Sequence, residues 1–222
     1  MSDKNSRSLA IAVLALAIVG LGVGFAAFQS TLTVSSSATV TPSATTFTSN
    51  IGFDTGSTNS SCTKTGESAS YNKGTVGATT ITGVSASFTE PGQSVVCTYK
   101  VNNTSPYLAY LTSINFGNGS TDKITCTKTD STATTTLVNS ACDTITVTAQ
   151  VGGTAFGTGG STATVTKGAN NSLAITGGTH TLAATSGTET VYVKIEYAGP
   201  ARADGAFSVS IPQIGLTYST VQ

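Results

Sequence analysis

Four cysteines are the residues of this chain best suited to form a covalent link. Their number is even, which favours two disulfide bonds if the chain leaves the cytoplasm. Three pairings are possible, and we favour Cys62–Cys97 and Cys126–Cys142 because the members of each pair are near in sequence. A metal site would need close spacing such as Cys-x-x-Cys, which the sequence lacks.

Other groups with catalytic or metal-binding chemistry are few. His180 is the only histidine, so it cannot supply a two-histidine metal site, and its place beside Gly177-Gly178 predicts a solvated residue at a strand end. Asp122, Asp130 and Asp143 gather around the second predicted disulfide, where they could hold Ca²⁺ with loop carbonyls or simply be solvated loop acids. The sequence has no Gly-x-Ser-x-Gly elbow and no phosphate loop. We therefore expect no enzyme activity and no cofactor.

The N-terminal end is typical of a secretory signal. A short tip with two basic residues precedes an apolar run, Leu9–Phe28, with small residues near its end. A cut between Ala26 and Ala27 would divide the chain into a signal peptide, residues 1–26, and a mature part, residues 27–222. The alternative is an uncleaved membrane anchor, because about 20 apolar residues also span a bilayer. Either way, we expect the rest of the chain to lie outside the cell or on its surface.

The composition excludes binding by charge. Only 9% of the residues are charged, and the formal net charge is zero, whereas binding to nucleic acid or to acidic lipid needs a basic face. We expect no nucleic-acid partner, and contact with a membrane only through the N-terminal segment. Thr, Ser, Gly and Ala dominate and Trp is absent, which favours strands with a hydroxyl-bearing outer face.

Apolar residues alternate with polar ones along much of the mature part. This period of two indicates half-buried strands, and no stretch after Phe28 keeps a helical period for three turns. The clearest strands are Val95–Val101, Ile145–Val151, Val191–Tyr197 and Phe207–Ile211. Shorter candidates are Leu32–Val40, Thr46–Phe53, Ile81–Phe88, Leu108–Phe116, Lys123–Lys128, Ala163–Val165, Leu173–Ile175 and Leu216–Tyr218.

Turn residues separate these strands. Pro-Gly, Gly-Gly and Asn-rich stretches lie between them, and Thr129–Ala141 reads as a long surface loop. Many short strands at this spacing predict an all-β protein, an antiparallel jelly-roll-like β-sandwich. No linker divides the mature part, so we expect one domain over residues 27–222, preceded by an apolar signal or anchor helix.

Two stretches resemble a known family. Gly24–Val40 joins the apolar run to a strand-like segment, and Val84–Thr104 contains Phe88-Thr89-Glu90-Pro91-Gly92-Gln93-Ser94 before a strand with an Asn-rich end. A Leu-x-Ser-Ile strand follows at Leu111–Ile114. Together they resemble the TasA/camelysin group of exported surface proteins, which are related to archaeal bundling pilins.

The resemblance implies a subunit of a cell-surface or biofilm filament. In that group the N-terminal segment of one subunit inserts as a strand into the next, so the partner would be another copy of the same chain. Residues 28–40 are the candidate segment here, with Leu32, Val34, Ala38 and Val40 as the side chains that enter the neighbour. The alternative is an ordinary first strand, paired within its own subunit.

Two further points bear on function. The camelysin name carries a peptidase association, but this chain has one histidine and no paired His/Glu motif on a helix.

The alternative function is a monomeric secreted or surface-anchored binding or adhesion module, for which Tyr107 and Tyr110 beside Pro106 are the aromatic candidates.

Overall fold

The computed structural model describes residues 44–116, 124–166, 172–173 and 180–220. All of them lie in one compact unit, Pro42–Gln222. The predicted signal segment, the cleavage position Ala26–Ala27 and the predicted donor residues Leu32, Val34, Ala38 and Val40 lie outside the described residues. Among the described residues, no helix is long and apolar enough to cross a membrane.

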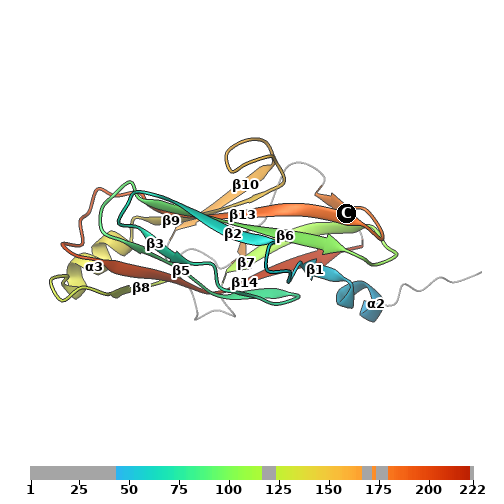
Figure 1. Cartoon of the computed structure of the whole chain (residues 1–222), viewed down its shortest axis with the longest axis horizontal. Helices are drawn as coiled ribbons and strands as arrows, with labels where there is room; N and C mark the ends of the chain where they lie inside the picture. Colours follow the sequence, from blue (N-terminus) through green and yellow to red (C-terminus); the bar gives the residue numbers. More distant parts are fainter. Residues whose placement is uncertain (1–43, 117–123, 167–171, 174–179, 221–222) are drawn as a thin grey trace, which may run out of the picture. The chain divides into compact units, whose positions relative to one another are not determined.

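The described chain forms two antiparallel sheets, as expected for a β-sandwich (Figure 1). Sheet A runs in the spatial order β1 (Ile51–Phe53), β6 (Ser94–Asn103), β13 (Gly187–Tyr197), β9 (Ile145–Val151) and β10 (Ser161–Thr166), and β2 (Ser60–Thr65) also pairs with β6. Sheet B runs in the order β11 (Ser172–Leu173), β7 (Ala109–Phe116), β14 (Phe207–Ser219), β5 (Thr80–Phe88) and β3 (Ser70–Asn72). Three short strands complete sheet B: β12 (Thr181–Leu182) on β7, β4 (Thr75–Val76) on β5 and β8 (Thr125–Lys128) on β14.

The core lies between the two sheets, and the predicted alternation builds it. In β6 the side chains of Val95, Cys97, Tyr99 and Val101 are buried, while Lys100 is exposed on the other face. The same inward pattern holds in β9 and β13 and along the first half of β14. Burying a Val, Leu, Ile or Phe side chain contributes about 1.5–3 kcal/mol relative to leaving it exposed, so these strands hold the two layers together.

The cysteine pairing favoured from the sequence is confirmed. Cys62 and Cys97 lie directly opposite each other on β2 and β6 and form one disulfide. Cys126 on β8 and Cys142 at the end of helix α3 (Thr135–Cys142) form the other. Two disulfides indicate an oxidising compartment, as in an extracellular or periplasmic protein.

Polar side chains hold the turns next to the two ends of β6. The Gln93 amide oxygen accepts hydrogen bonds from the backbone N–H groups of Thr89 and Glu90, which closes the Pro91-Gly92 turn. At the far end of β6, the fully buried Asn103 donates to the carbonyls of Tyr107, Leu182 and Ala183. These residues therefore have structural roles in this fold.

Three local predictions were wrong. Thr46–Phe53 is not one strand, because Ala44–Ser49 forms the short helix α2 and only Ile51–Phe53 is extended. Thr129–Ala141 is not all loop, because Thr134 caps α3 by accepting from the Leu137 N–H. Phe207–Ile211 and Leu216–Tyr218 are parts of one strand, β14.

Candidate functional site: an open seam between the sheets

The C-terminal end of β14, from Leu216 onward, has a strand partner on one side only within the described part of the chain. On one side it pairs with β8 and then with β7 as far as Ser219. On the other side its pairing with β5 ends at Gly215, opposite Thr80. The backbone of Leu216–Tyr218 therefore has a side on which no described strand pairs with it. Such an edge presents N–H and C=O groups that can template another strand.

β5 ends here because the chain turns. The Gly77 N–H donates to the Thr80 carbonyl at 2.8 Å, which closes the turn between β4 and β5. The carbonyl of Ala78 in this turn accepts a hydrogen bond of 2.8 Å from the Phe53 N–H of β1. A Cβ atom at Gly52 would collide with the same carbonyl, so glycine permits the close approach. β1 of sheet A thus meets sheet B at the turn, and no described strand closes the seam between the sheets beyond it.

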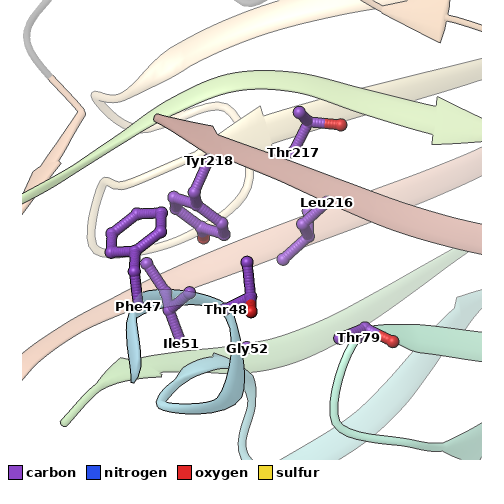
Figure 2. A pocket seen from close by; sticks show the side chains of 8 residues that line it. All are labelled: Phe47, Thr48, Ile51, Gly52, Thr79, Leu216, Thr217 and Tyr218. Carbon is purple, nitrogen blue, oxygen red and sulfur yellow. The ribbon is translucent and has the colours of Figure 1, made fainter. Parts of the chain in front are cut away.

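The open part of the seam is a pocket of about 200 Å³, which we call the seam pocket. Helix α2 and β1 form one wall and the end of β14 forms the other (Figure 2). Phe47 and Ile51 are buried at 7% and 8% exposure, whereas Leu216 and Tyr218 are only half-buried. Its lining residues are Phe47, Thr48, Ile51, Gly52, Thr79, Leu216, Thr217 and Tyr218.

The alternation of inward-facing and outward-facing residues shifts by one position within sheet B, and this change of phase turns Leu216 and Tyr218 toward the pocket. Up to Ile211 the odd-numbered residues of β14 are buried, but from Ile214 onward the even-numbered residues face inward. The change falls at Pro212, which cannot donate to the ladder. In β5 it falls at Gly83, whose φ of +73° suits glycine. The apolar side chains at the end of β14 thus point between the layers, where the described residues leave them partly uncovered.

The sequence-predicted site residues are not brought together at one place. Tyr107 and Tyr110, the aromatic candidates for a binding platform, are both half-buried, and Tyr107 packs against the core. Asp122 lies outside the described residues. The Asp130 carboxylate accepts hydrogen bonds from the Thr132 N–H and hydroxyl, which lower its pKa. The described residues contain no group of three side chains able to ligate a metal.

His180 differs from its prediction. It is not solvated, because its side chain is only 9% exposed and its Nδ1 lies 3.2 Å from Oε1 of Glu189 on β13. The pair lies between the layers at the end of the sandwich that holds the seam pocket, since β12 and β14 flank the same end of β7. Sequence reasoning missed it because Glu189 alternates with Thr residues and carries no motif.

Comparisons with known proteins give no family for this chain. No family model matches it, and no curated protein matches it. Among solved structures, it is similar to TmCBM61, a carbohydrate-binding module solved in complex with β-1,4-galactotriose, at 11% identity over 72% of this chain and 88% of that one, with a TM-score of 0.29. It is also similar to the enzymatically active domain of tailspike protein 4 of bacteriophage CBA120, at 10% identity over 72% and 19% of the two chains, with a TM-score of 0.26. Likenesses this weak carry no argument about function.

Proposed function

We propose that this protein is a structural subunit of an extracellular cell-surface or biofilm filament. Residues 28–40 of one copy add as a strand to β14 of the next copy and fill its seam pocket. The observation that carries the proposal is the edge of Leu216–Tyr218, which no described strand covers and which borders an apolar pocket. Main-chain hydrogen bonds would supply the affinity, and alternate side chains would supply the fit.

The spacing of apolar side chains supports this arrangement. Leu32 and Val34 are two residues apart, as are Leu216 and Tyr218 on β14. In extended strands such pairs lie on one face and roughly 6.7 Å apart. A strand carrying Leu32 and Val34 therefore places its apolar side chains at the spacing that β14 presents. Each buried side chain of this size contributes about 1.5–3 kcal/mol.

Export and processing fit the same proposal. The jelly-roll-like sandwich forms outside the cytoplasm, where its two disulfides are stable. Removal of residues 1–26 frees the segment that follows. The contact is heterologous, because the donor segment and the seam pocket are different surfaces of one chain. A heterologous contact that does not close into a ring gives an open filament. Neither catalysis nor a cofactor is part of the proposed role.

Electron microscopy of two forms of the mature protein tests this function. We expect uniform filaments from the intact mature chain and monomers from a variant that lacks residues 28–40. As matched substitutions, Leu32→Ser with Val34→Ser should prevent filaments, whereas Thr31→Ser with Thr33→Ser should leave them intact. Filaments of unchanged repeat from the shortened chain would rule out the donor strand. Monomers from the intact chain would favour the binding module instead.

A further inference from the structure

The only histidine of the chain belongs to a buried polar cluster between the layers. His180 Nδ1 contacts Glu189 Oε1 at 3.2 Å, and the two side chains are 9% and 17% exposed. The other polar atoms of the pair, His180 Nε2 and Glu189 Oε2, are buried and have no hydrogen-bond partner among the described residues. A buried carboxylate without full compensation is unfavourable, so the charge state of His180 matters to this region.

Strand register brings this pair and the seam pocket to one interlayer space. His180 lies two residues before Leu182, which is buried opposite Ala109 of β7. The His180 carbonyl accepts from the N–H of Leu111 at 3.1 Å. Leu111 in turn pairs with Tyr218 of β14. His180 and Tyr218 thus approach from sheet B, on either side of β7, while Glu189 approaches from sheet A.

Tyr218 connects the pair to the seam pocket. Its side chain lines the pocket (Figure 2). Burial raises the pKa of its phenol, and the nearby Glu189 carboxylate raises it further. Of the other titratable groups here, the exposed Lys100 lines a second pocket together with Glu189, apart from the seam pocket. Tyr110 lies opposite the exposed Thr181 on the outer face of sheet B. Glu189 is therefore the charge that His180 faces directly.

We propose that protonation of His180 strengthens docking in the seam pocket, so that subunits assemble more readily at mildly acidic pH. This inference rests on the proposed filament function. A strand inserted beside Tyr218 removes water from that side of the cluster and makes the Glu189 charge more costly to leave uncompensated. An imidazolium at His180 offsets that charge, whereas a neutral imidazole does not. Because the imidazole loses this charge as the pH rises, assembly should weaken in that direction.

The test is the critical concentration for assembly of the full mature chain between pH 5.5 and 8.5. For the wild type we expect a value about tenfold lower at the acidic end, which corresponds to about 1.4 kcal/mol. His180→Gln and Glu189→Gln should each remove most of this pH dependence. Glu90→Gln is the control, because it breaks the exposed Arg202–Glu90 pair beside the Pro91-Gly92 turn, away from the cluster. Melting curves at each pH check that every variant is folded.

The outcomes separate the two proposals. The role of His180 would be overturned if the critical concentration of the wild type did not change with pH. It would also be overturned if the critical concentration changed equally in a folded His180→Gln or Glu189→Gln protein. Either result would leave the filament function standing. No filaments at any pH would overturn the filament function and this inference with it.

Discussion

A Leu216→Glu protein should fold with both disulfides intact but fail to form filaments. Leu216 is half-buried, so a glutamate here can reach solvent in the free subunit and lowers its stability little. In the filament the inserted strand would cover this position and bury an unpaired carboxylate, which is strongly unfavourable. We expect the critical concentration for assembly to rise by more than about 100-fold, the equivalent of roughly 3 kcal/mol. Sedimentation and electron microscopy measure this rise.

Ser208→Glu is the matched control on the same strand. Ser208 lies on the outer face of β14, where β5 and β8 already pair with the strand on both sides. The Ser208→Glu substitution introduces the same charge without altering the seam pocket, so filaments should form as in the wild type. Equal loss of assembly in both variants would mean that the added charge, and not the pocket, is responsible. Normal filaments from Leu216→Glu would show that the pocket is not the docking site.

Loss of either disulfide should lower the free energy of unfolding by roughly 3–4 kcal/mol. The bonds close loops with sequence separations of 35 and 16 residues, and this range follows from the loss of chain entropy in the unfolded state. Cys62–Cys97 ties the edge strand β2 to β6, and Cys126–Cys142 ties β8 to α3. Urea unfolding of Cys62→Ala/Cys97→Ala and Cys126→Ala/Cys142→Ala proteins gives the two values separately.

The two pairs should also differ in their local effects. Without the second disulfide, α3 keeps the Thr134 cap and the buried Val138 and Ala141, so hydrogen exchange should rise mainly in α3 and β8. Without the first, exchange should rise in β2, whose described strand pairing is with β6 alone. Destabilisation of less than about 1 kcal/mol for both pairs would contradict a fold that depends on them in an oxidising compartment.

Alternation predicted most of the sandwich because its long strands are buried on one face only. β6, β9 and β13 each place apolar residues at every second position, and the structure buries those positions. The helices were missed for different reasons. α2 has only six residues, too few for a helical period to stand out. The cap at Thr134 was present in the sequence but lay within a run of Thr and Ser.

The candidate site was less predictable than the fold. The seam pocket exists because β5 ends at Thr80 while β14 continues past Gly215. The register that sets these two ends relative to each other cannot be predicted from the sequence of either strand alone. The phase change at Pro212 also divided β14 into two apparent strands. His180 and Glu189 meet across the interlayer space from separate sheets, and their local sequences carry no sign of that contact.

The central claim is that residues 28–40 of one copy dock in the seam pocket of another. It is tested most directly by mixing two singly substituted mature proteins, Val34→Cys and Tyr218→Cys, and adding a short thiol cross-linker during assembly. We predict a covalent dimer that contains one chain of each kind, formed only under conditions that give filaments. A doubly substituted protein, Val34→Cys/Tyr218→Cys, serves as the comparison. The account would be contradicted if this protein formed a cross-link within single chains while the mixture gave no mixed dimer, because the segment would then lie in its own subunit.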